Sequence, residues 1–173
     1  MAVRLSEAKA RAVSLAVPGG VIIAADTLVY LDGQVLGKPA DGSAAIDTLR
    51  SLRGRSHVVF SGMTLIDGRS AWQCTKLAAT TVHMRCYSED EIAAYVSSGD
   101  PLDKAGAYAI QYRGFRPVER VEGCYANVMG LPLCHLYKML RTAGLAPAET
   151  PVAACNDFNR RVCAVADRIL GEV

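Results

Sequence analysis

An uninterrupted apolar run at residues 21–25, Val-Ile-Ile-Ala-Ala, constrains the fold more than any other feature of the chain. A short continuous run of this kind is typical of a strand that is covered on both faces. The chain stays extended through residues 28–31 and reaches Asp32-Gly33, a dipeptide that favours a two-residue hairpin turn, after which residues 34–36 return. The sequence therefore predicts an interior strand whose far end folds back beside it.

The remaining segments alternate between helical and extended patterns. Leu5, Ala8, Ala12 and Leu15 fall on one helical face, which predicts a first helix over residues 5–15. Ser88 and Glu91 form a capping-box pattern that starts a helix closed by Gly99. Further helices are expected at residues 41–52 and 133–140, and further strands at 57–66, 71–84 and 115–121. This mixture predicts an α/β or α+β fold with a mixed sheet.

The length and composition fit one compact domain with a short appendage. The chain has 173 residues and is 51% hydrophobic, which is enough for a sizeable core. Residues 144–151 are rich in Pro and Ala and indicate a linker. Phe158, Val162, Val165 and Ile169 then recur at helical intervals. We therefore expect a domain over residues 1–143, a linker over 144–151 and an appended C-terminal helix over 152–173.

Charge and cysteine spacing exclude several classes of protein. The formal net charge is only +2, and no run of basic residues is present, so a nucleotide fits better as a partner than a nucleic acid polymer. We expect no membrane span and no signal peptide, and hence a cytoplasmic protein. The six cysteines contain no C-x-x-C pair, which argues against a zinc site and favours reduced, buried thiols.

An acidic and a basic side chain flank the predicted hairpin. Asp26 follows the apolar run, and Lys38 follows the returning strand. A carboxylate and a cation brought together are the minimum parts for holding a metal ion and a phosphate. The segment that ends in Gly37-Lys38 is not a Walker A loop, because it is one residue too short and Pro39 replaces the Ser or Thr that would hold magnesium.

Two later segments complete a recognisable set of motifs. They read Asp-Lys-Ala-Gly-Ala-Tyr-Ala-Ile-Gln at residues 103–111 and Asn-Val-Met-Gly-Leu-Pro-Leu at residues 127–133. With Ala-Asp-Thr at 25–27, Gly-Lys-Pro at 37–39 and Leu-Ser-Glu-Ala-Lys-Ala at 5–10, they resemble the Maf proteins, the septum-formation inhibitor family of nucleoside triphosphate pyrophosphatases. The resemblance extends from about Leu5 to Leu140 and implies a fold similar to Maf and inosine triphosphate pyrophosphatase.

The resemblance implies roles for the charged residues. Asp26 is similar to the family's catalytic carboxylate, which would activate water or hold a divalent metal, magnesium or manganese. Lys38 and Lys104 would bind the phosphates of a nucleoside triphosphate, and Asp103 would be a second metal ligand. Lys9 is similar to another cationic position that binds substrate.

The resemblance also implies how the base is read. Thr27 and Gln111 are the candidates, because an amide offers both a donor and an acceptor to the imide edge of uracil or thymine. The Ile110-Gln111 ending is similar to the branch of the family that hydrolyses dTTP and UTP. Tyr112 stands where the family usually has glycine.

Two functional hypotheses stay open. In the first, the chain hydrolyses dTTP or UTP to the monophosphate and pyrophosphate and removes non-standard nucleotides from the pool. In the second, it is a catalytically silent Maf-like protein that binds nucleotide or a cell-division partner. The second is motivated by the family's usual opening, S-x-S-P-R-R, which nothing before Leu5 supplies.

A start codon assigned too far downstream would also explain this difference. If Met1 were the true start, the family's first strand would be missing, which predicts poor solubility or a homodimer that covers an apolar sheet edge.

Overall fold

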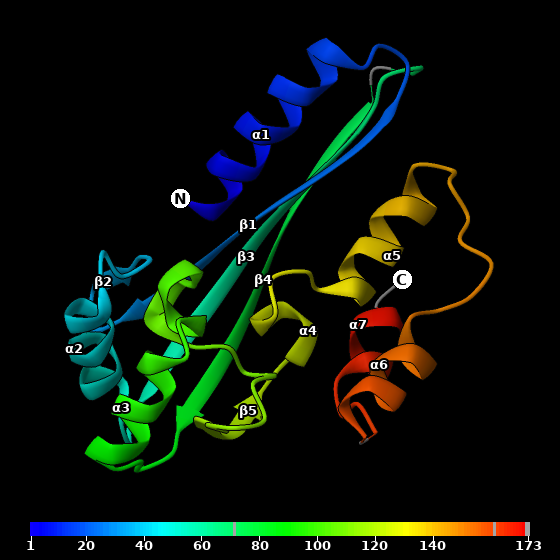
Figure 1. Ribbon diagram of the computed structural model, residues 1–173. Coiled ribbons are helices and arrows are strands. Elements are labelled where there is room, and N and C mark those ends of the chain that lie inside the picture. The colour runs from blue at the N-terminus through cyan, green and yellow to red at the C-terminus, as the bar shows by residue number, and fades with distance from the viewer. Residues whose placement is uncertain (71, 161, 172–173) are drawn as a thin grey trace. The chain divides into compact units, whose positions relative to one another are not determined.

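The computed structural model describes residues 1–70, 72–160 and 162–171, and Figure 1 labels its elements. Strand hydrogen bonding gives one five-stranded sheet in the order β2-β1-β3-β4-β5. The strands are β1 (Val21–Leu31), β2 (Gln34–Leu36), β3 (Ser56–Asp67), β4 (Trp72–Met84) and β5 (Val118–Glu122). The α-helices are α1 (Ala2–Ala16), α2 (Gly42–Leu52), α3 (Glu89–Ser97), α4 (Tyr125–Val128), α5 (Leu133–Thr142), α6 (Val152–Asn159) and α7 (Ala166–Gly171). The predicted α/β architecture is confirmed.

The chain divides into two compact units. Unit 1 comprises Met1–Thr27, Ser61–Ala79 and Gly123–Val173, and unit 2 comprises Leu28–Phe60 and Thr80–Glu122. The long strands β1, β3 and β4 each contribute residues to both units. Within the described part of the chain, no helix combines the length and the apolar character needed to cross a bilayer.

In unit 1, helix α1 lies very close to strand β3. A Cβ atom added to Gly62 would come within 2.5 Å of the backbone of Ala2, so only glycine allows this approach. The residues of α1 that are buried are accordingly small: Ala2, Ser6 and Ala10, spaced four apart. The hydroxyl oxygens of Ser6 and Thr64 lie 2.9 Å apart and join the helix to β3.

The face of α1 expected from the sequence is therefore not the face that packs. Leu5, Ala8, Ala12 and Leu15 are all exposed, Leu15 to 85%. The helix uses its small residues against the glycine because larger side chains would not fit there. Hydrophobic periodicity predicted the helix correctly but not its buried side.

The core of unit 1 lies between β3 and α5. Met63 and Leu65 of β3 pack with Leu136 and Met139 of α5, and Ala25 of β1 packs against this cluster. Because side chains alternate along a strand, the partly buried Ala25, which packs on the core cluster, directs the next residue to the other face of the sheet. That next residue is Asp26.

Unit 2 contains the predicted hairpin and the predicted helix caps. Asp32 and Gly33 both have positive φ, 48° and 86°, as a type I′ turn requires, and Val29 pairs with Leu36. The Ser88 hydroxyl accepts from the Glu91 backbone, and the Glu91 carboxylate accepts from the Ser88 backbone, so the capping box is complete. Both expectations are confirmed.

Three segments differ from the expected pattern or lie partly outside the described residues. Strand β5 begins at Val118, later than expected, because Phe115 turns into an aromatic cluster and stacks on Tyr95 with ring centroids 4.5 Å apart. The region expected as one helix over 152–173 forms two helices, because α6 ends at Asn159, Arg160 follows in the left-handed conformation with φ of 52°, and α7 begins at Ala166. The expected start of the fourth strand, Ala71, and residues 161, 172 and 173 of the expected C-terminal helix lie outside the described residues.

Candidate active site

Asp26 lies inside strand β1, since the strand continues without a break from Val21 to Leu31. The sequence had indicated that the carboxylate follows the end of a strand. The longer strand holds the Asp26 backbone rigid on both sides, and only 14% of its side chain is exposed. A carboxylate that is fixed in this way is well positioned for chemistry.

Lys9 of α1 holds one oxygen of this carboxylate. The Lys9 Nζ donates to Asp26 Oδ1 at 2.6 Å and to the Ala25 carbonyl at 3.4 Å. The lysine side chain is 55% exposed, so solvent screens the pair and its net contribution to stability is below about 1 kcal/mol. The contact therefore serves to orient the Asp26 carboxylate and adds little to the stability of the fold.

The second carboxylate oxygen of Asp26 differs from the first because it lacks a hydrogen-bond partner among the described residues. Oδ2 is buried and has no hydrogen-bond partner among the described residues. A buried carboxylate oxygen without a partner is costly, so it indicates that a cation or a proton donor binds there. Lys9 on Oδ1 fixes the carboxylate so that Oδ2 remains available.

Asp26 Oδ2 is a candidate ligand for a divalent cation. In the described part of the chain, no three His, Cys, Asp or Glu side chains gather as a ready-made metal site. Magnesium commonly binds through one or two carboxylates and completes its coordination with water and substrate phosphate oxygens. One available carboxylate oxygen meets that requirement.

In unit 2, Lys104 lies between two carboxylates. Its Nζ contacts Asp103 Oδ1 at 2.7 Å, Asp100 Oδ1 at 3.2 Å and the Asp100 carbonyl at 2.9 Å. Partial burial lowers the pKa of Lys104, but the hydrogen bonds to Asp103 and Asp100 outweigh it and raise that pKa above the ordinary value. Lys104 therefore stays charged at any physiological pH.

Lys38 belongs to the neighbouring loop. The Gly106 backbone donates to the Gly37 carbonyl at 3.0 Å, which joins the Lys38 loop to the loop that contains Lys104. Gly106 has φ of 74°, and a Cβ atom added to it would come within 3.1 Å of the Val29 side chain, so the glycine of this motif is needed both for its conformation and for close packing.

The Lys104 ammonium, and to a smaller extent that of Lys38, lowers the pKa of Asp103. The Asp103 carboxylate is 78% exposed and pairs with Lys104, so it would need to exchange this partner to bind a metal.

Thr27 supports the Asn127–Leu133 motif from inside unit 1. Its hydroxyl lies 2.7 Å from the Ser61 hydroxyl and donates to the Gly130 carbonyl at 3.4 Å, and Ser61 donates to the Asn127 carbonyl at 3.2 Å. No local sequence pattern singles out Ser61, because its role depends on a contact with a residue 66 positions away. These contacts place Thr27 at the base of the loop that leads into α5.

Gln111 is exposed in a turn of unit 2, directly before Tyr112. The Tyr112 ring packs on Tyr95 with centroids 4.8 Å apart, so the residue that replaces the family's glycine joins the aromatic cluster.

The structure thus forms two groups of candidate residues. Lys9, Asp26 and Thr27 lie together in unit 1, and Lys38, Asp103 and Lys104 lie on adjacent loops of unit 2.

These two groups carry the motifs of a known class of protein, and sequence comparison identifies it. The family model described as "Maf-like protein" matches residues 1–143, so the chain belongs to the Maf-like family.

Individual relatives are similar over most of this chain. A Dehalococcoides mccartyi protein named dTTP/UTP pyrophosphatase is 44% identical over 142 residues, which cover 82% of this chain and 63% of the relative. Proteins of the same name from Carboxydothermus hydrogenoformans and Methanosarcina barkeri are 44% and 43% identical over 144 residues, 83% of this chain and 77% and 73% of theirs. The chain thus spans less than two thirds of the Dehalococcoides protein and about three quarters of the other two.

Proposed function

We propose that the chain is a nucleoside triphosphate pyrophosphatase that hydrolyses dTTP or UTP. One water and one triphosphate yield the nucleoside monophosphate and pyrophosphate. The reaction belongs to nucleotide-pool maintenance, including removal of modified nucleotides, and we place it in the cytoplasm for that reason. The domain responsible would be residues 1–143, followed by a linker at 144–151 and a C-terminal appendage.

The arrangement at Asp26 carries this proposal. One oxygen of the carboxylate is held by the Lys9 ammonium at 2.6 Å, and the other is buried without a partner among the described residues. Hydrolysis requires a group that takes the proton of the attacking water or holds a cation beside the phosphate. Asp26 Oδ2 can serve either purpose, and the names of the relatives supply the class of substrate.

The other candidate residues act on the rest of the nucleotide. Lys38 and Lys104 bind phosphate oxygens and stabilise the charge that develops on the leaving pyrophosphate. Lys9 orients the Asp26 carboxylate. Thr27 and Gln111 select a base with an imide edge. A magnesium or manganese ion, held by Asp26 with Asp103 as a second ligand, would neutralise the charge of the phosphates.

Product analysis tests the proposal directly. The chain is incubated with dTTP, UTP and dGTP in the presence of magnesium or manganese, and the products are resolved by phosphorus NMR. Pyrophosphate together with dTMP or UMP is the expected result. Release of inorganic phosphate alone, or no turnover of any nucleotide, would contradict it.

The silent alternative is separated by binding. Calorimetric titration with dTTP, run beside the product assay, gives heat without product if the chain only binds nucleotide. Heat and product together support the enzyme.

Removal of one phosphate-binding cation should slow the reaction strongly. Lys104→Met is expected to reduce kcat/KM by about 10²- to 10³-fold, as loss of a group that stabilises developing charge does in other enzymes. Lys76→Met removes an exposed lysine of β4 and serves as the matched control. Equal rates for the two variants would show that Lys104 does not contact the substrate.

A further inference from the structure

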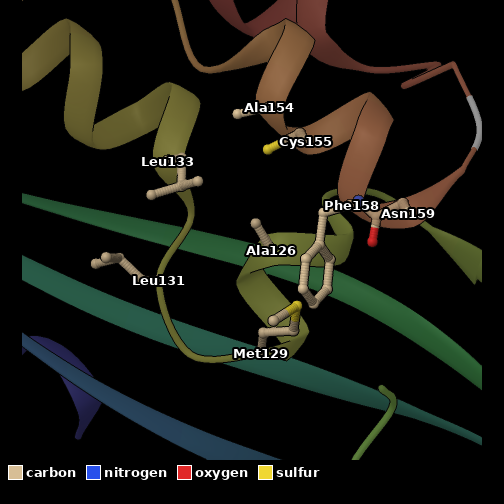
Figure 2. Close-up of a pocket in the computed structure, with 8 residues that line it drawn as sticks. All are labelled: Ala126, Met129, Leu131, Leu133, Ala154, Cys155, Phe158 and Asn159. Atoms are coloured by element: carbon tan, nitrogen blue, oxygen red, sulfur yellow. The ribbon is translucent and has the colours of Figure 1, made fainter. Parts of the chain in front are cut away.

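A cavity lies in unit 1, formed by the start of α5, the α4 region and helix α6. Its volume is about 390 Å³, within the range of small-molecule sites. Met129, Leu131 and Leu133 form one wall, and Phe158 and Asn159 belong to the opposite helix (Figure 2). Figure 2 shows the Phe158 ring directed towards Met129.

The cavity is made jointly by the family domain and the C-terminal segment. Its first wall belongs to residues 1–143, which the family model matches, whereas α6 lies beyond them. None of the candidate active-site residues lines the cavity. A ligand bound there would therefore contact both the family domain and the C-terminal segment, but not the motifs at residues 25–27 and 103–111.

The chemistry of the lining restricts the ligand. Among the described residues, no charged side chain lines the cavity, so a phosphorylated nucleotide would lose its hydration there without compensation. Cys155 also lines it, and burial raises the pKa of this thiol, so the sulfur stays uncharged at neutral pH. Phe158 and Met129 offer an aromatic ring and a thioether, both of which contact aromatic rings favourably. The ligand should therefore be uncharged and aromatic.

One polar atom defines the ligand further. Asn159 Oδ1 is buried and has no hydrogen-bond partner among the described residues, although Asn159 lines the cavity. An amide oxygen accepts hydrogen bonds, and a buried acceptor that is left unpaired is costly. A ligand that donates one N–H or O–H to Oδ1 would satisfy it.

Two exposed apolar side chains at the cavity support the same conclusion. Phe158 is 58% exposed and Met129 is 41% exposed, and both would be covered by a ligand that lies between them. We propose that this cavity binds a small, uncharged aromatic molecule that carries one hydrogen-bond donor, with the donor on Asn159 Oδ1 and the ring between Phe158 and Met129.

Indole is a suitable probe, and 1-methylindole is its matched control, because methylation removes the single donor and leaves the ring. Protein labelled with ¹³C at the methionine methyl groups reports binding at Met129, whose signal is assigned with Met129→Leu. Indole should shift this signal saturably and leave those of Met63 and Met84 unchanged. Because 1-methylindole cannot form the hydrogen bond to Asn159, its affinity for the protein should be about 2- to 10-fold lower than that of indole.

Two pairs of proteins make the test decisive. Ala154→Phe fills the cavity and should abolish the shift, whereas Ala153→Phe adds the same ring to the neighbouring position of α6, which does not line the cavity, and should preserve it. In Asn159→Leu, indole and 1-methylindole should bind equally.

The proposal is overturned by any of three results. These are no saturable shift with indole, equal binding of indole by the two phenylalanine variants, or equal affinity of the wild-type protein for the two ligands. The last result would be expected if water already satisfies Asn159. Since the readout is a methyl resonance, these results do not depend on whether the chain hydrolyses dTTP.

Discussion

His57 should make the stability of the protein depend on pH. The side chain is 3% exposed on β3, and its Nε2 lies 2.8 Å from the Tyr108 hydroxyl. Burial, together with the nearby charge of His83, lowers the pKa of His57 to about 4 from the model-compound value of 6.5. The folded protein therefore holds this histidine in its neutral form well below the pH at which an unfolded histidine is protonated.

The magnitude follows from the two pKa values. Between pH 6.5 and pH 4 the unfolded chain binds a proton that the folded chain does not, so the free energy of unfolding falls as the pH falls. The difference between 6.5 and about 4, at 1.36 kcal/mol for each pKa unit, corresponds to about 3 kcal/mol in full. At pH 5 the expected loss relative to pH 8 is about 2 kcal/mol.

Urea denaturation followed by circular dichroism measures this quantity at pH 8, 6, 5 and 4.5. His57→Gln should be less stable at pH 8, since it disturbs a buried contact, but its stability should decline less between pH 8 and pH 5. Ser6→Ala, which disturbs a buried contact without removing a titratable group, is the control and should retain the wild-type slope. Carboxylates titrate in all three proteins, so the difference between the slopes isolates His57. Equal slopes for His57→Gln and the wild-type protein would refute the reasoning.

Two further predictions concern single residues. Gly62→Ala should destabilise the protein by about 1–3 kcal/mol, because its Cβ would collide with the α1 backbone at Ala2. Gly37→Ala is the control and should have little effect, because the space around Gly37 is open. Thermal unfolding measures the stability of both variants. Ser88→Ala removes the cap of α3 and should cost about 1 kcal/mol in urea denaturation, whereas Ser97→Ala, at the other end of that helix, should cost less than half as much. Equal effects within either pair would contradict the corresponding contact.

The features that the sequence predicted correctly depend on local chemistry. The turn at Asp32-Gly33 needs two residues with positive φ, and the capping box at Ser88 needs two side chains three residues apart. Each requirement is met within four or five residues, so each could be recognised without knowledge of the fold. The family resemblance likewise rested on short motifs, and the matched range confirms it.

The features that could not be predicted depend on distant contacts. The buried side of α1 is set by Gly62, which lies on another element, and so the more apolar face around Leu15 remained exposed. The pairing of Lys9 with Asp26 and the contact between Thr27 and Ser61 also join separate elements. Even so, the motifs identified Lys9, Asp26 and Thr27 as candidates before their contacts were known.

The central claim is that the carboxylate of Asp26 is required for hydrolysis of a pyrimidine nucleoside triphosphate. The most direct test is the rate of pyrophosphate release from dTTP with magnesium in Asp26→Asn, which keeps the size of the side chain and removes its charge. Asp47→Asn, on α2, is a matched control at an exposed aspartate. Asp26→Asn should lose at least about 99% of the wild-type rate, in line with removal of a general base, whereas Asp47→Asn should keep an unchanged rate. A wild-type rate in Asp26→Asn would contradict it.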